Sequence, residues 1–364
     1  MKRFLHSPVA VALCAALLFL PLKDLKSAAL LFVFILAGLY AAPRIRRIKI
    51  PPLPFKLPRT EGPLQILAVA VFALLPLAVK DYYMDVLIMF GIYAILALGL
   101  NVIVGFTGQL NLGFAAFYAI GAYTYALLNT RLGLGFWPSL PIAACFASLS
   151  GLVLGVPALR LKGDYLAIVT LGFGEIVRIV LNNWDAFTKG PNGIAGIAPP
   201  SMAGISLGKL QHYYYLVFLM LIAAVFVIRR VESSKTGRAW LAIKENEIAA
   251  STMGIDTTAY KLYAFAFGTF WAGIAGTLFA GKMQFVSPES FTFMESVLIL
   301  SMVILGGIGN VYGAILGAFI LVIMPELLRD AQLYRMLVLG ICLVALMIFR
   351  PQGLIGAKDA SAGR

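Results

Sequence analysis

Two short segments of the sequence place flexible backbone and side-chain amides between long apolar runs. The first contains three glycines and two amides: Gly105, Gly108, Gln109, Asn111 and Gly113. Glycine permits backbone angles that other residues avoid. If the flanking runs cross a membrane, such irregular backbone must be buried in protein or line a water-filled cavity. The segment therefore indicates a solute pathway or, alternatively, close helix packing through small residues.

The second segment lies near the other end of the chain and has a similar composition. It contains Gly306, Gly307, Gly309 and Asn310. Glycine-interrupted segments in both halves of a membrane protein point to a transport pathway, and close packing is again the alternative. No Lys followed by Ser or Thr comes after these glycines, and the phosphate-loop pattern is absent from the whole sequence. Any ATP must therefore be bound by another chain.

Glu175 and Arg178 lie three residues apart inside another apolar run. On a helix this spacing puts both side chains on one face, where they can pair. Ionisable side chains in membrane segments are costly and usually face the protein interior. The sequence predicts either a structural ion pair or, in a secondary transporter, part of a proton relay.

The residues that most enzymes and metal centres use are scarce. His6 and His212 are the only histidines, which argues against a His-dependent active site or a multi-His metal centre. The cysteines lie far apart in apolar runs without metal-ligand spacing: Cys14, Cys145 and Cys342. We therefore expect a chain that is not an enzyme and that binds no metal or cofactor of its own.

The composition explains what surrounds these residues. The chain is 61% hydrophobic and only 12% charged, whereas a soluble domain has about 45–50% apolar and about 25% charged residues. Such a chain fits a bilayer, where the solvent itself is apolar. The net charge of +13 does not indicate nucleic acid, because the basic residues lie in short loops rather than in a stripe with aromatic residues.

The apolar runs predict an all-α integral membrane protein, a polytopic bundle of about 10–12 transmembrane or partly re-entrant helices. We expect spans near 8–22, 28–42, 64–79, 82–105, 113–129, 138–159, 165–181, 213–229, 260–281, 293–308, 311–328 and 334–349. Several are shorter than the roughly 20 residues that cross hydrocarbon, which suggests re-entrant or broken helices. The first run follows Lys2 and Arg3 like a secretory signal, but without a clear cleavage site we favour a retained helix.

The positions of Lys and Arg predict the orientation of the bundle. With the N-terminus inside, 19 of the 29 basic residues fall in inner segments, nine in outer loops, and Arg178 within a span. Because Lys and Arg are retained on the cytoplasmic side, we expect both termini and loop 229–261 in the cytoplasm. Loop 182–212, the longest outer connection, should face outward.

Two loops divide the chain and suggest contacts. Segment 43–63 has six prolines and six basic residues, so it predicts a cytoplasmic linker that either touches anionic lipid or only sets topology. Residues 1–63 would form a two-helix extension with this linker, 64–356 the transmembrane domain, and 357–364 a cytoplasmic tail. Loop 229–261 predicts one amphipathic helix, Arg238–Met253, that docks a motor subunit or lies on lipid.

Several long stretches in the same order resemble the permease subunits of bacterial branched-chain amino acid ABC importers, of the type with an extra N-terminal region. They are GFTGQLNLGFAAFYAIGAY (105–123), LKGDYLAIVTLGFGEIVRIVLNN (161–183), TKGPNGIAGI (188–197), LILSMVILGGIGNVYGAILGAF (298–319), PELLR (325–329) and RPQGLIG (350–356). The resemblance runs from about Ile88 to Gly356 and implies the ABC importer permease fold in a bacterial inner membrane.

The resemblance also implies partners. A second related permease would complete the pathway for Leu, Ile and Val, two cytoplasmic subunits would use ATP, and a periplasmic or extracellular amino-acid-binding protein would dock outside, with no nucleic acid involved. The coupling loop of the family is matched at Ala249, Ala250 and Gly254, while Ile248 occupies its acidic position. Further candidates in this loop are Glu245 and Glu247, and candidates for the binding-protein contact are Gly190, Pro191, Asn192 and Gly193.

Other functions remain open at this point. A permease of the same scaffold could carry another small solute, such as urea, another amino acid or a sugar. An autonomous proton-coupled transporter would need a clear chain of membrane acids, and a membrane-embedded enzyme would need a cluster of His, Cys or carboxylate groups; neither pattern is visible.

Overall fold

The computed structural model of the chain describes residues 81–158, 163–202 and 208–327, together with positions 76, 161, 205, 206, 340, 353 and 354. All of these belong to the unit Leu67–Arg364, one of two into which the chain divides. The predicted extension 1–63, the tail 357–364 and the spans at 8–22, 28–42, 64–79 and 334–349 lie outside the continuously described residues.

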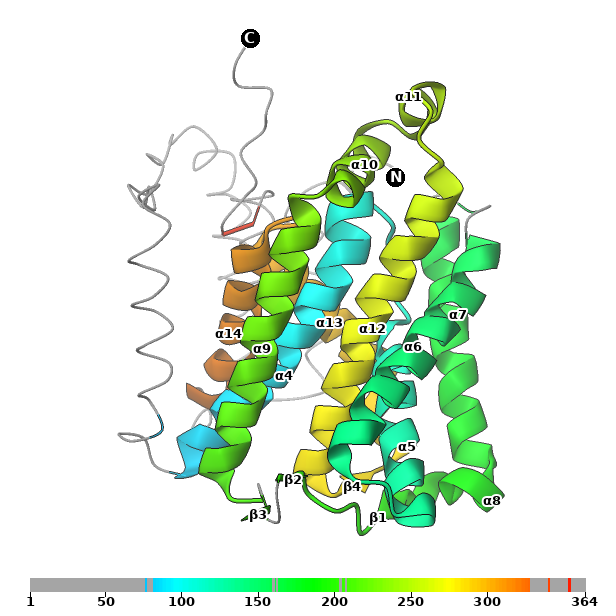
Figure 1. The fold of residues 1–364 in the computed structure, drawn as a ribbon. Coiled ribbons are helices and arrows are strands. Elements are labelled where there is room, and N and C mark those ends of the chain that lie inside the picture. Colours follow the sequence, from blue (N-terminus) through cyan, green and yellow to red (C-terminus); the bar gives the residue numbers. More distant parts are fainter. Residues whose placement is uncertain are drawn as a thin grey trace, which may run out of the picture. The chain divides into compact units, whose positions relative to one another are not determined.

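Apolar helices run back and forth along the bundle (Figure 1). The longer ones are α4 (Asp81–Leu100), α5 (Phe114–Leu132), α6 (Phe136–Ala158), α7 (Asp164–Asn183), α9 (Leu210–Glu232), α12 (Thr257–Met283), α13 (Phe293–Gly306) and α14 (Val311–Leu327). They coincide with the eight spans predicted between 82 and 328. Five of the described helices are long and apolar enough to cross a membrane, if α4 is counted with its continuation to Phe106.

Shorter elements mark the two ends of the bundle (Figure 1). At one end lie α10 (Lys235–Glu245) and α11 (Glu247–Thr252). At the other lie α8 (Asp185–Thr188) and the strands β1 (Ile194–Ala195), β2 (Ser201–Met202), β3 (Ile205–Ser206) and β4 (Phe285–Val286). The strands pair antiparallel, β1 with β4 through Ile194 opposite Val286, and β2 with β3 through Ser201 opposite Ser206. We call these ends the α10–α11 end and the strand end.

Helix α12 packs against α4, α5 and α6 through small residues. A β-carbon on Gly99 of α4 would lie 2.6 Å from the Gly268 carbonyl oxygen, and one on Gly121 of α5 would lie 2.5 Å from that of Gly273. Small side chains let helix backbones approach closely where lipid gives no hydrophobic driving force. The all-α membrane fold predicted from composition is therefore confirmed, with α12 in its core.

Among the described residues, 3₁₀ or π segments lie at η2 (Asn101–Phe106), which continues α4, and in the connections at η3 (Gly190–Asn192) and η4 (Pro288–Phe291). Between η2 and α5 the backbone is irregular, and α13 has only 14 residues. A helix of that length is too short to cross about 30 Å of hydrocarbon. Broken and short helices were expected in these two regions.

The predicted helix Arg238–Met253 is wrong in one respect, because the segment forms two helices. Asn246 interrupts it with extended backbone angles (φ −158°, ψ 107°). The Asn246 side chain accepts a hydrogen bond from the Ala249 amide at 3.0 Å and so caps α11. The apolar pattern continues across Asn246, which is why periodicity alone favours one helix.

Candidate functional site

The π-helical segment η2 continues α4 and ends in the first glycine break. All six of its residues are buried, and π-helical turns frequently occur at functional sites. A β-carbon on Gly105 would lie 2.2 Å from Asn101 Oδ1 and 2.7 Å from the backbone nitrogen of Gly309. Only glycine therefore fits at position 105.

The two glycine breaks meet in space. The Gly309 amide donates a hydrogen bond to Asn101 Oδ1 at 2.9 Å, across 208 residues of sequence. Gly309 has φ +86°, a conformation that other residues rarely adopt. The C-terminal motif also reaches this break, since the Leu354 amide donates to the Leu305 carbonyl at 2.9 Å. We call the contact between residues 101–106 and 305–310 the glycine junction.

A lysine from α10 completes the glycine junction. Lys244 Nζ donates a hydrogen bond to the Gly105 carbonyl oxygen at 2.8 Å. Burial of the ammonium group lowers the pKa of Lys244, and the neighbouring Glu245 carboxylate acts in the opposite direction. Lys244 as a whole residue is exposed, and its hydrogen bond to Gly105 is partly buried. Beside it, the Phe106 and Trp240 rings stack with centroids 6.4 Å apart.

From Gly108 to Gly113 the backbone is not helical. Gln109 and Asn111 are both buried, at 6% and 0% exposure. The Leu112 amide donates to Thr170 Oγ1 at 3.0 Å, and the Gly113 amide donates to Asn111 Oδ1 at 2.9 Å. The Leu112 and Gly113 amides thus find side-chain partners, as irregular backbone at membrane depth requires, whereas Asn111 Nδ2 is buried without a hydrogen-bond partner.

The first turns of α5 and α13 meet inside the bundle. The Ala115 amide donates to Ser296 Oγ at 2.9 Å. A small, open pocket lies beside this contact, lined by Ala115, Ser296, Thr292 and Glu175 among others. Glu175 accepts a hydrogen bond from Arg178 Nε at 2.8 Å, so the predicted ion pair is confirmed, while its place in a pathway stays a prediction.

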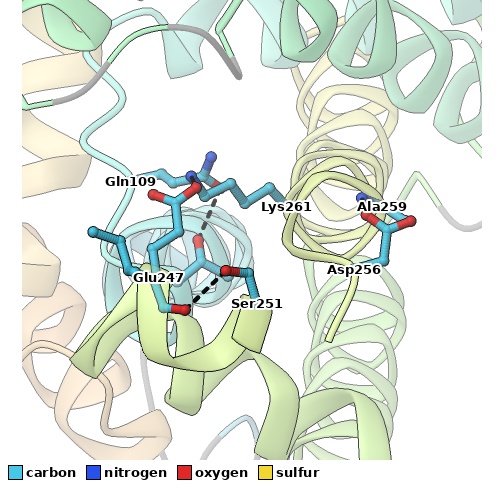
Figure 2. A network of polar contacts seen from close by, with 8 residues as sticks. Gln109, Glu247, Ser251, Asp256, Ala259 and Lys261 are labelled. Carbon is cyan, nitrogen blue, oxygen red and sulfur yellow. Dashed lines mark hydrogen bonds and ion pairs between the residues drawn. The ribbon is translucent and has the colours of Figure 1, made fainter. Parts of the chain in front are cut away.

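The α10–α11 loop combines one internal ion pair with exposed apolar side chains. Lys261 Nζ, on α12, lies 2.5 Å from Glu247 Oε1, and Figure 2 shows Lys261 pointing from α12 toward Glu247 on α11. Ile248 and Met253 are 70% and 82% exposed. Gly254, at φ +83°, follows the end of α11, as predicted. Glu247 is therefore engaged within the chain.

The remaining loop candidates divide by exposure and position. Ala250 is buried, whereas Glu245 and Ala249 are exposed at the α10–α11 end. Gly190, Pro191 and Asn192 form η3 near the strand end.

Gly193 follows η3 and leads into the strand end. A β-carbon on Gly193, which has φ +67°, would lie 2.4 Å from the Val286 carbonyl oxygen. Loops 182–212 and 229–261 thus lie at opposite ends of the bundle (Figure 1).

Sequence reasoning missed four residues that organise the site: Asn101, Thr170, Lys244 and Ser296. Asn101 and Thr170 were visible as lone polar residues in apolar runs, which is a signal for a buried hydrogen bond. Nothing local distinguishes Lys244 from the other basic residues of its loop. Its role depends on where α10 lies relative to η2.

The structure is a bundle of apolar helices in which two glycine breaks contact each other and the α10–α11 loop. These features are those of a multi-pass membrane permease. Residues 82–347 match the family described as "Branched-chain amino acid transport system / permease component". The chain therefore belongs to this family of ABC transporter permeases. It is a transport subunit and is not itself catalytic.

Curated relatives agree with this assignment. The chain is 47% identical over 330 residues to the high-affinity branched-chain amino acid transport system permease protein LivM of Escherichia coli K12, covering 83% of this chain and 78% of that protein. It is 27% identical to LivH of Salmonella typhimurium over 73% of this chain and 92% of that protein. It is 25% identical to the autoinducer 2 import system permease protein LsrC of Yersinia pseudotuberculosis, covering 79% and 84%. No solved structure matches.

Proposed function

We propose that this chain pairs with a related permease subunit to form the pathway for leucine, isoleucine and valine in an ATP-driven importer. The observation that carries the proposal is the 47% identity to LivM over most of both chains. The weaker similarity to LivH, a permease of the same named transport system, favours a related second subunit as the partner.

The proposed partners occupy opposite ends of the bundle. Two ATPase subunits would dock at the α10–α11 end, where Ile248, Met253 and the Glu245 region are exposed. A soluble amino-acid-binding protein would dock at the strand end, near η3. ATP would be used only by the ATPase subunits.

The orientation follows from the same arrangement. With the ATPases in the cytoplasm of a bacterial cell, the α10–α11 end and both termini would be cytoplasmic, in agreement with the excess of basic residues there. A Glu245→Cys variant without other cysteines should react with a membrane-impermeant maleimide only after the cells are opened. Labelling in intact cells would contradict this orientation.

We place the substrate pathway along residues 105–113 and 306–310, beside the pocket near Glu175. The polar groups concentrated there are Gln109, Asn111 and Asn310, and the helix N-termini of α5 and α13 converge nearby. Amides and helix N-termini suit the polar end of an amino acid, and an apolar wall suits its side chain.

Reconstitution would test the function. Proteoliposomes with this chain, its related permease, the two ATPases and the binding protein should accumulate radiolabelled leucine only when ATP is inside. Urea and a sugar would be added as competing solutes. They test the alternative substrates, because the similar permease LsrC is named for autoinducer 2 import. Leucine uptake driven by a proton gradient without ATP would favour an autonomous transporter instead.

A further inference from the structure

The α10–α11 loop touches the rest of the bundle in two chemically different ways near the glycine junction. One is apolar, where Trp240 is 1% exposed and stacks on Phe106. The other is polar, where Lys244 Nζ donates to the Gly105 carbonyl at 2.8 Å. Apolar contacts tolerate sliding because they are not directional, whereas a hydrogen bond is strongly directional and so fixes the position of its donor relative to its acceptor.

Lys244 lies close to both glycine breaks. Its ammonium nitrogen bonds Gly105 and lies 3.4 Å from the point where a β-carbon on Gly309 would be. Its stem passes Gly108, whose β-carbon position is 3.4 Å from Lys244 Cγ. The Lys244 side chain therefore contacts Gly105 and lies beside Gly108 and Gly309, which belong to two separate segments.

The hydrogen bond of Lys244 links α10 directly to the backbone of η2. Its acceptor is a neutral carbonyl, and within the described part of the chain no carboxylate forms an ion pair with Lys244. By contrast, Lys261 of α12 is paired with the Glu247 carboxylate at 2.5 Å and is 6% exposed, so this contact joins α11 to α12 and not to the glycine junction.

We propose that Lys244 is a positioning residue for transport: its hydrogen bond to Gly105 transmits movement of α10 to both glycine breaks. Helix α10 moves when the ATPases close beneath it, and the lysine carries that displacement to the Gly105 carbonyl. Because the Gly309 amide is tied to Asn101 of the same π-helical turn, the second break follows the first. This inference rests on the proposed function.

The test uses the complete reconstituted importer with Lys244→Met, which keeps the length of the stem and removes the donor. We expect the ATPases to co-purify and to hydrolyse ATP, while leucine uptake per ATP hydrolysed falls about tenfold, the factor that one charge-assisted hydrogen bond contributes. Lys244→Arg should restore part of the ratio. The matched control is Lys235→Met, an exposed lysine on the same helix, which should leave the ratio unchanged.

Amide hydrogen exchange gives a second measurement, which would not change if Lys244 only stabilised the fold. In the wild-type complex, exchange of the peptide spanning 101–113 should change when a non-hydrolysable ATP analogue binds, and Lys244→Met should abolish that change. An unaltered uptake ratio, or an unaltered exchange response, would overturn the proposal. So would failure of Lys244→Met to assemble when Lys235→Met assembles, because Lys244 would then serve folding. If the wild-type complex itself shows no ATP-dependent leucine uptake, the proposed function fails instead.

Discussion

The two glycine breaks have similar sequences, yet they are held in place by different parts of the molecule. Around Gly306 the partners are local: its β-carbon position lies 1.9 Å from the Gly313 carbonyl oxygen, and the Gly313 amide donates to Asn310 Oδ1 at 3.0 Å. Around Gly113 the partner is distant, since a β-carbon there would lie 1.9 Å from the Thr170 carbonyl oxygen of α7.

Around Gly306 the turn is therefore held by its own two helices, although Gly309 in the same turn still contacts Asn101 of η2. The α13–α14 turn brings its own two helices together, so its glycines serve a hairpin. Residues 105–113 depend on α7, α10 and the α13–α14 turn, so their conformation responds to where those elements lie. We expect a substitution at Gly306, inside the hairpin, to act first on folding. Substitutions in the first break, or at Gly309 where the second break contacts it, should act more on transport.

The largest effect should come from Gly306→Ala. The added methyl group would meet backbone at 1.9 Å, and backbone cannot rotate away as a side chain can, so α13 and α14 must separate. Overpacking of this kind costs about 1–3 kcal/mol and sometimes more. Membrane abundance of the complex should fall strongly. Gly135→Ala, where no atom lies within 4 Å, is the control; equal abundance of the two variants would refute the hairpin role.

Gly113→Ala should have a nearly equal effect, but more on transport activity than on membrane abundance. Its methyl group would push α5 away from α7 at Thr170 and weaken the Leu112–Thr170 hydrogen bond. A buried amide left without its partner costs about 1–3 kcal/mol. We expect uptake per assembled complex to fall further than abundance. Gly172→Ala, on α7 with open space around it, should behave as wild type. A loss of abundance alone would contradict the distinction between the breaks.

Gly309→Ala should have an intermediate effect. At φ +86° an alanine is strained by about 1–3 kcal/mol, and its methyl group would approach the Gly105 carbonyl at 3.1 Å. The protein should insert normally and show reduced uptake in proteoliposomes. Gly108→Ala, with φ +72° but an exposed position, should show less reduction. Normal uptake by both variants would contradict the assignment of the two glycine breaks to the substrate pathway.

The smallest effect should follow Gly254→Leu. No atom lies within 4 Å of the added β-carbon, but φ is +83°, so the cost is backbone strain at the end of α11 without a clash. We expect weaker ATPase co-purification or a lower ratio of uptake to ATP hydrolysis, with binding-protein docking retained. Pull-down of the ATPases and of the binding protein from the same preparation would measure both. Unchanged ATPase retention together with unchanged coupling would refute a role of Gly254 in docking.

The sequence by itself determined the features that depend on near neighbours or on composition. The apolar fraction of the chain indicated a membrane protein. The apolar runs between residues 82 and 328 predicted helices with bounds close to those observed. The Glu175–Arg178 pair followed from a spacing of three, and the stop after α11 followed from Gly254. These features need only the local chain and the surrounding solvent.

Only the tertiary structure decided which distant residues meet. That Gly105 faces Gly309, that Lys244 reaches Gly105, and that Glu247 is paired with Lys261 all depend on how α4, α10, α12 and the α13–α14 turn pack. Each glycine could equally have served a bend or a close contact, because its missing side chain permits both. Which of these two roles each glycine has depends on contacts between segments up to 208 residues apart in the sequence. No local sequence pattern encodes such contacts.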